Sequence, residues 1–298
     1  MIGEGLAFVS ALCFAFGSIA IVKSRPATRS DNGLLLSIVL TGLFALAAWL
    51  FFGRPLPAKG GSEWWPAIGW FAAAGIFSTV WGRMTLYRSV QLAGVVRATT
   101  IRRLTPFFSA LFAWVLLGEM LSPIATLGLA ALAASFALLY IDNRKPDDGM
   151  LSKESISKGC FLALLCALTY AASYVFRSGG LAGVPDPFFG AFIGAATALL
   201  YYCVTGAISR TATIQVRSLY AVDRFQFAAA SFISLGQVIQ FVALNHTTVA
   251  RVAVVNSVEI FLSTYLAVFI FRTERFPSAL AVTATTLATI GLIAVATG

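Results

Sequence analysis

One carboxylate and several arginines stand inside stretches of the sequence that are otherwise apolar. Glu259 lies near the middle of the apolar run 247–271, and Arg83 and Arg103 lie within two earlier apolar runs. An ionisable side chain inside a membrane-spanning segment is costly unless it is paired or hydrated, so each such residue is a functional candidate by default. A guanidinium binds carboxylate or phosphate through two parallel hydrogen bonds, and a buried carboxylate can bind a proton or a cation.

These opposite charges suit a solute that carries both signs. If Arg103 and Glu259 face one cavity, the anionic group of an amino acid or another zwitterion would meet the arginine, and its cationic group would meet the glutamate. Glu259 is also the predicted coupling residue, because it is the single carboxylate expected at mid-membrane depth and could exchange protons during a transport cycle. The alternative is a permanent structural ion pair between Glu259 and an arginine such as Arg83 or Arg103.

Hydroxyl, amide and aromatic side chains on neighbouring segments complete the candidate site. Their hydrogen bonds are individually modest and can be exchanged, which suits reversible binding. Hydrogen bonding between helices is the alternative use of each. The predicted substrate-binding residues are Trp81, Arg83, Tyr87, Thr100, Arg103, Tyr170, Tyr174, Gln237, Gln240, Asn256 and Glu259.

Other residues near this set predict local structure. Arg97, Arg102 and Arg251 stand where long side chains can extend to the membrane interface, and we expect them to do so. Pro106 cannot donate a backbone hydrogen bond to the carbonyl of Arg102, so the segment is expected to bend there. The bend would either help to line a polar cavity or serve packing alone.

The composition requires a lipid environment for such segments. Hydrophobic residues make up 59% of the 298 residues and charged residues 11%, against about 25% charged in an ordinary soluble domain. A soluble fold cannot hide that much apolar surface, whereas a bilayer can cover it. The net charge of +9 lies mostly in short connections, where it can face lipid headgroups, so no nucleic-acid partner is expected.

The apolar runs predict an all-α membrane protein of ten transmembrane helices, since each run approaches the roughly 20 residues that cross a bilayer. One long polar stretch divides the chain into a first unit 1–141, a linker 142–157 and a second unit 158–298. The predicted spans are approximately 5–23, 33–52, 65–90, 93–117, 123–141, 158–176, 187–208, 224–244, 247–271 and 278–297.

The two units are copies of one segment. With an offset of 154, Gly5 aligns with Gly159 and Phe16 with Tyr170. Five helices per copy is an odd number, so the second copy enters the membrane from the opposite side and the repeats are inverted. A cavity is therefore expected between them, near the bilayer midplane.

The distribution of Lys and Arg predicts the orientation. The odd-numbered connections contain twelve of them, against three (Arg54, Lys59 and Arg177) in the even-numbered ones. The odd connections are therefore expected in the cytoplasm of a bacterial cell, with both termini on the other side of its inner membrane.

The sequence lacks several motifs that enzymes use. It contains no GxxxxGK[ST] phosphate loop, no CxxC pair and only one histidine, His246. We therefore expect no cofactor, no metal site and no enzymatic activity.

A family resemblance rests on residues 97–141. Pro106, the run Leu116-Leu117-Gly118-Glu119, Pro123 and Gly128 follow the pattern of the closing helices of an EamA-type repeat, and the segment resembles that branch of the drug/metabolite transporter superfamily. The second copy is weaker, with Phe271-Arg272-Thr273-Glu274 at the equivalent place. The resemblance implies ten helices in two repeats and secondary transport, commonly the export of amino acids or other small metabolites.

Rival functions stay open at this point. Because arginines outnumber acids in the membrane segments, an exchanger of organic anions such as sugar phosphates or nucleotide-linked sugars is the second candidate within transport. A lipid-modifying enzyme is disfavoured by short connections without paired carboxylates, and a sensor or assembly subunit is a third class. The sequence also leaves open a homodimer, the direction of transport and protons as a partner.

Overall fold

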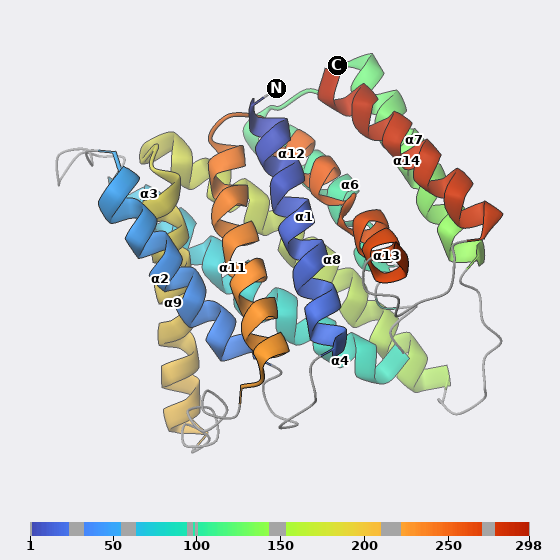
Figure 1. Cartoon of the computed structure of the whole chain (residues 1–298). Helices are drawn as coiled ribbons and strands as arrows, with labels where there is room; N and C mark the ends of the chain where they lie inside the picture. The colour runs from blue at the N-terminus through green and yellow to red at the C-terminus, as the bar shows by residue number, and fades with distance from the viewer. Residues whose placement is uncertain are drawn as a thin grey trace.

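The computed structural model describes residues 2–23, 33–54, 64–93, 98, 101–142, 153–209, 222–269 and 278–297. These residues are almost entirely helical and include no strand (Figure 1). Five of the helices, α1, α2, α8, α9 and α11, are long and apolar enough to cross a membrane by themselves. The prediction of an all-α membrane protein is confirmed.

Each of the ten predicted spans falls on one described helix or on consecutive helical segments. The third span is an α-helix, a π-helix (η1) and a second α-helix in unbroken succession, and the ninth is a pair of short helices. The bounds are α1 Ile2–Lys23, α2 Leu34–Phe52, α3 Trp64–Gly75, η1 Ile76–Gly82, α4 Arg83–Ala93, α6 Thr105–Leu117, α7 Pro123–Asp142, α8 Lys153–Gly183, α9 Pro187–Ile208, α11 Arg224–Leu244, α12 Val249–Asn256, α13 Glu259–Phe269 and α14 Ala279–Thr297.

Local capping explains why several boundaries follow the sequence closely. The Asp186 carboxylate accepts hydrogen bonds from the first backbone N–H groups of α9, which has Pro187 in its first turn. Asp223 and Gln226 form a reciprocal capping box at the start of α11. Helix α6 ends at Gly118, whose φ of 68° lies in the left-handed region that glycine adopts without strain.

Helix α8 is longer than predicted at both ends. It begins at Lys153, so the last residues of the predicted linker 142–157 are helical. An i,i+4 ion pair, Lys158 Nζ to Glu154 Oε1 at 2.6 Å, favours the helix there, and Ser155 donates to the backbone carbonyl of Leu92. At its other end α8 continues to Gly183, so Arg177 lies within the helix and not in a connection.

The packing pairs follow a two-fold exchange of the two halves. Helix α1 packs on α11, and its counterpart α8 packs on α3, η1 and α4. Helix α6 packs on α8, and its counterpart α13 packs on α1. Helices α2 and α9 pack on each other, as do α7 and α14 along one side of the bundle (Figure 1). This is the arrangement expected of inverted halves; their division at 141 and 158 stays a prediction.

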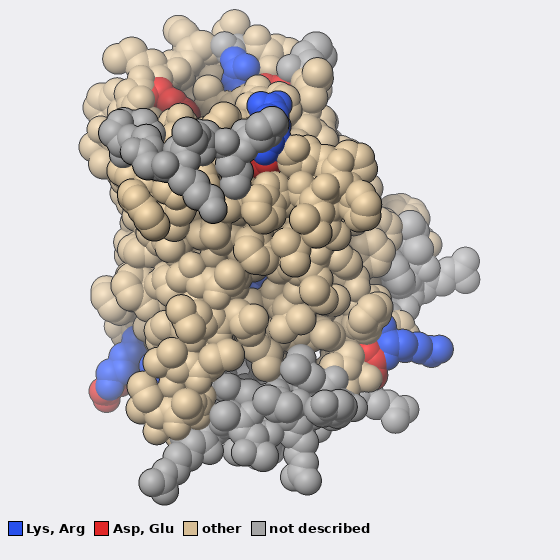
Figure 2. Space-filling view, turned by 90° about the vertical axis from the view of Figure 1, so that its left-hand side faces the viewer, with Lys and Arg blue, Asp and Glu red and all other residues tan. Residues whose placement is uncertain are grey.

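The ends of the bundle differ in polarity from its middle. Helix α1 begins and α14 ends at the same end of the bundle (Figure 1), as an even number of spans requires. Figure 2 shows that the charged side chains on one face gather near the two ends, while other residues cover the middle almost throughout. A belt of this kind suits the hydrocarbon layer of a membrane. The predicted cytoplasmic side of the odd connections stays a prediction.

Candidate transport cavity

A cavity of about 330 Å³ lies inside the bundle between the two halves. It reaches the end at which α2 and α11 begin, where Gly33 and Gln226 line it, and extends inward to Arg177 and Gln240. Beyond these residues, toward the start of α1, a cluster of buried apolar side chains fills the bundle. Its members there include Ala7, Ala243, Leu244, Val249 and Val252. The cavity is therefore closed at that end by packing.

Two interrupted helices bring charged residues to this cavity. A turn at residues 103–104 precedes α6, and a turn at residues 257–258 separates α12 from α13. These positions are equivalent at the offset of 154 found in the sequence. Hydroxyls bond to backbone carbonyls at both breaks: Thr105 donates to the Arg102 carbonyl at 2.6 Å, and Ser257 donates to the Val254 carbonyl at 2.6 Å. Interrupted helices near the centre of a membrane are typical of transporter binding sites.

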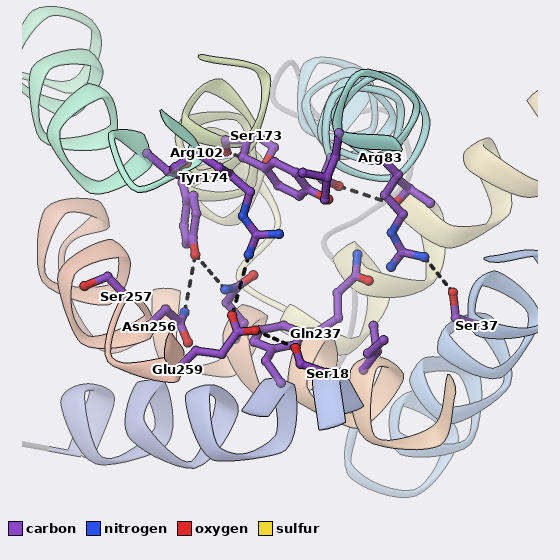
Figure 3. A pocket seen from close by; sticks show the side chains of 18 of the residues that line it. Ser18, Ser37, Arg83, Arg102, Ser173, Tyr174, Gln237, Asn256, Ser257 and Glu259 are labelled. Atoms are coloured by element: carbon purple, nitrogen blue, oxygen red, sulfur yellow. Dashed lines mark hydrogen bonds and ion pairs between the residues drawn. The ribbon is translucent and has the colours of Figure 1, made fainter. Parts of the chain in front are cut away.

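Glu259 is the carboxylate of the cavity and is the first residue of α13. Its Oε1 accepts a hydrogen bond from the Ser18 hydroxyl at 2.9 Å, and its Oε2 lies 3.8 Å from Arg102 Nη2 (Figure 3). The start of a helix favours negative charge. The alternative prediction was an ion pair between Glu259 and an arginine such as Arg83 or Arg103. An arginine does pair with Glu259, but it is Arg102.

Arg102 was expected at the membrane interface, and that expectation was wrong. It lines the cavity, and its guanidinium lies 5.7 Å from the ring centroid of Tyr170. The break at 103–104 turns the chain so that Arg102 and not Arg103 meets Glu259. Arg251, also expected at the interface, forms an ion pair with Glu4 at 3.4 Å. Arg97 lies outside the described residues.

Arg83 stands across the cavity from the Arg102–Glu259 pair. Its Nη1 donates to the Ser37 hydroxyl at 2.6 Å, and Ser37 in turn donates to the Leu34 carbonyl at 2.8 Å. Figure 3 shows the Gln237 side chain between Arg83 and Glu259. No carboxylate of the described residues lies within ion-pair distance of Arg83. The cavity thus presents a free cation on one side and a paired carboxylate on the other.

Arg103 also lines the cavity but is directed against an aromatic ring. Its guanidinium lies 5.8 Å from the centroid of Phe136 in α7. The Nε and Nη1 atoms are enclosed and have no hydrogen-bond partner among the described residues. A buried, unsatisfied guanidinium of this kind is costly unless a ligand or a movement of the protein satisfies it.

A chain of hydrogen bonds at the inner end of the cavity joins α8, α11 and α12. Arg177 Nη1 donates to Gln240 Oε1, Gln240 Nε2 donates to the Tyr174 hydroxyl at 2.8 Å, and Asn256 Nδ2 approaches the same hydroxyl at 3.4 Å. Arg177 is only 4% exposed and packs over the ring of Phe241, 4.7 Å from its centroid. Sequence reasoning placed three of these residues in the site and missed Arg177. The apolar residues that follow it in the chain were the signal that could have found it.

Most predicted site residues meet at this cavity. Arg83, Arg103, Tyr170, Tyr174, Gln237, Gln240, Asn256 and Glu259 all line it. Trp81 does not: it is 42% exposed and packs on Phe77 with ring centroids 4.8 Å apart. Trp81 lies inside the π-helix η1, where each turn contains more residues than in an α-helix, so counting at α-helical spacing places it on the wrong face. Thr100 lies outside the described residues, and so does the side chain of Tyr87.

The described lining residues carry an excess of positive charge. Four arginines line the cavity, at positions 83, 102, 103 and 177, against the single carboxylate of Glu259. In the part of the chain that the structure describes, no three His, Cys, Asp or Glu side chains come together as a metal site would need. The chemistry that the cavity offers is the binding of charged groups, with anions favoured.

Comparison with known proteins agrees with this architecture. Residues 1–141 match the model of the EamA-like transporter family. A protein of known crystal structure aligns with 99% of this chain and 96% of its own, with a TM-score of 0.71 and 21% identity, a likeness that concerns the fold alone. Among curated proteins none gives a significant match. Residues 1–141 therefore form an EamA-like transporter domain, as found in the drug/metabolite transporter superfamily, and the apolar helices mark a multi-pass integral membrane protein.

Proposed function

We propose that this transporter moves small carboxylated metabolites, amino acids foremost, by alternating access across a bacterial inner membrane, with export as its direction. One observation carries the proposal: Arg83, which has no carboxylate partner among the described residues, faces the ion-paired carboxylate of Glu259 across the cavity. The carboxylate of an amino acid would bind Arg83 through two parallel hydrogen bonds. Its ammonium group would lie toward Glu259.

The size of the cavity supports a small solute. Pockets for small molecules are roughly 300–1,000 Å³, and a volume of about 330 Å³ lies at the lower end of that range. An amino acid fits this space better than a nucleotide-linked sugar. The hydroxyls and amides around it, from Tyr174, Gln237 and Asn256, can hydrogen-bond such a solute and release it again.

Glu259 also gives the transporter a route to proton coupling. Its carboxylate belongs to the second half and contacts two residues of the first half, Ser18 of α1 and Arg102 beside the break at 103–104. Protonation removes the attraction for Arg102 and for an ammonium group alike, so proton binding and solute binding at Glu259 would compete. A carrier that exchanges the two would use a proton gradient to drive solute movement.

Transport by reconstituted protein tests both parts of the proposal. A thermal-shift screen first identifies the amino acid, because a ligand at about 100 times its Kd stabilises the folded state by about 2.7 kcal/mol. In proteoliposomes Arg83→Gln should abolish uptake of that solute. The control Arg88→Gln, which changes an exposed arginine further along α4, should transport normally. Equal loss in both variants would contradict the role of Arg83.

A separate variant isolates the coupling. Glu259→Gln keeps the size and the hydrogen-bond capacity of the side chain but cannot titrate. It should lose acceleration by a pH gradient while unlabelled solute on the far side still drives exchange of radiolabelled solute. Undiminished gradient-driven uptake by this variant would reject proton coupling at Glu259.

An exchanger of organic anions is the second candidate, and the excess of arginine in the cavity favours it. Sugar phosphates or nucleotide-linked sugars would then replace amino acids as the stabilising ligands in the thermal-shift screen. Stabilisation by phosphorylated sugars, with none by amino acids, would decide for this candidate.

A further inference from the structure

We infer that the transported solute carries a second anionic group and that Arg177 binds it at the inner end of the cavity. The inference rests on the proposed function and refines its substrate class to compact dicarboxylates, acidic amino acids among them. The structure points to it through the charge balance of the cavity, the confinement of Arg177 and the position of Arg177 relative to Arg83.

The charge balance of the cavity leaves room for more than one anionic group. Glu259 neutralises Arg102, and the carboxylate of a simple amino acid would neutralise Arg83. Arg103 and Arg177 then keep their charge without an acidic partner among the described residues. Uncompensated charges inside a membrane protein are costly, so a solute with a second anionic group is held better than one without it.

Arg177 is better prepared to bind that group than Arg103. Gln240 fixes one end of its guanidinium and the Phe241 ring supports its face, so little conformational freedom remains to be lost on binding. Among the described residues its buried Nε has no hydrogen-bond partner. Arg103 also lies over a ring, that of Phe136 in α7, but no hydrogen bond to a described residue fixes its Nε or Nη1. A fixed guanidinium with an unused donor is the usual form of a carboxylate-binding group.

The two arginines lie at different depths of the cavity. Arg83 is bonded to Ser37, in the first turn of α2, toward the end at which the cavity meets the edge of the bundle. Arg177 lies at the inner end with Gln240 and Tyr174. A solute with a carboxylate at each end would engage Arg83 with one and Arg177 with the other, and the ammonium of an acidic amino acid would face Glu259, which also lines the cavity.

The expected selectivity is large, because a site that is built to hydrogen-bond a substrate group leaves its own polar atoms unpaired when the group is missing. We expect purified wild-type protein to bind L-aspartate and succinate at least tenfold more tightly than L-alanine, measured by isothermal titration in detergent. This wild-type comparison needs no variant to fold. If L-alanine binds as tightly as L-aspartate, the inference is overturned while the proposed function stands.

Variants then assign the effect to Arg177. Arg177→Gln should lower L-aspartate affinity at least tenfold and leave L-alanine affinity nearly unchanged. Arg177→Lys keeps the positive charge but not the two parallel N–H donors of the guanidinium, so it should recover part of the loss. The Arg88→Gln variant serves as the matched control. An equal loss for both amino acids in Arg177→Gln would mean a structural role and overturn the assignment. If none of the three probes binds wild-type protein, the inference and the proposed amino-acid function both fail.

Discussion

The Arg102–Glu259 pair joins the two halves of the protein, and its strength can be estimated from its geometry. The charged atoms are 3.8 Å apart. At that distance the attraction is about 1 kcal/mol in bulk water and about 4 kcal/mol at an effective dielectric constant of about 20. The side chains are 34% and 19% exposed, so the pair lies between these limits and retains part of its hydration. After the cost of desolvation, we expect a coupling free energy of about 1–2 kcal/mol.

A double-mutant cycle measures this coupling. The destabilisations caused by Arg102→Gln and by Glu259→Gln should add up to more than that of the double variant, since each single change leaves a partly buried charge without its partner. Unfolding would be followed in mixed detergent micelles by tryptophan fluorescence. The coupling is the difference between the double variant and the sum of the singles.

The Glu154–Lys158 pair provides the control. Its atoms are closer, at 2.6 Å, but its side chains are 77% and 67% exposed, so its coupling should be no more than about 0.5 kcal/mol. Burial and not distance should decide the order of the two couplings. A coupling for Arg102–Glu259 that is no larger than that of this exposed pair would refute the estimate and, with it, the idea that the pair holds the two interrupted helices together.

Two further predictions concern packing and pH. A Cβ at Gly75 of α3 would overlap the backbone of Gly194 in α9, so Gly75→Ala should destabilise the protein by about 1–3 kcal/mol; Gly69→Ala in the same helix meets nothing and should be neutral or stabilising by up to about 1 kcal/mol. Equal melting temperatures for the two variants would contradict the close crossing. Burial raises the pKa of Glu119, in the connection after α6, above its ordinary 4.5, against the opposing effect of hydrogen bonds from backbone N–H groups that begin α12. The stability that Glu119 contributes is therefore full below pH 4.5 and is lost as the pH rises through its raised pKa. Glu119→Gln should consequently gain stability relative to wild type as the pH is raised from acidic to neutral. A constant difference in melting temperature across that range would disprove it.

The sequence predicts the helices of this fold well because a bilayer imposes their length and their apolar composition. Boundaries are predicted best where short-range chemistry marks them, as at Asp186-Pro187 and at the Asp223 capping box. The ends of α8 were missed because they depend on other contacts. One end is favoured by the Glu154–Lys158 pair and by the hydrogen bond from Ser155 to the Leu92 carbonyl. The other end continues through Gly179 and Gly180, which pack against aromatic rings of α3.

The members of the site could be predicted, but their pairing could not. A charged residue in an apolar run reveals itself in the sequence, which is why Arg83 and Glu259 were found. Choosing between Arg102 and Arg103 as the partner of Glu259 requires the rotation of the chain at that point, since neighbours on a helix point about 100° apart. That rotation is set by the breaks at 103–104 and 257–258, and the break at 257–258 is marked by no glycine or proline.

Duplication explains the position of the site, and divergence between the copies explains its chemistry. At the offset of 154, Arg102 corresponds to Asn256 and Thr105 to Glu259. Both interrupted helices therefore bring their breaks to one cavity, but the first copy supplies the cation and the second the anion. Two identical copies would place like charges at the cavity, and these would repel each other. A binding site for a solute with both signs of charge thus requires this asymmetry, and reversing it with the double variant Arg102→Glu and Glu259→Arg should keep the ion pair but weaken binding of the solute.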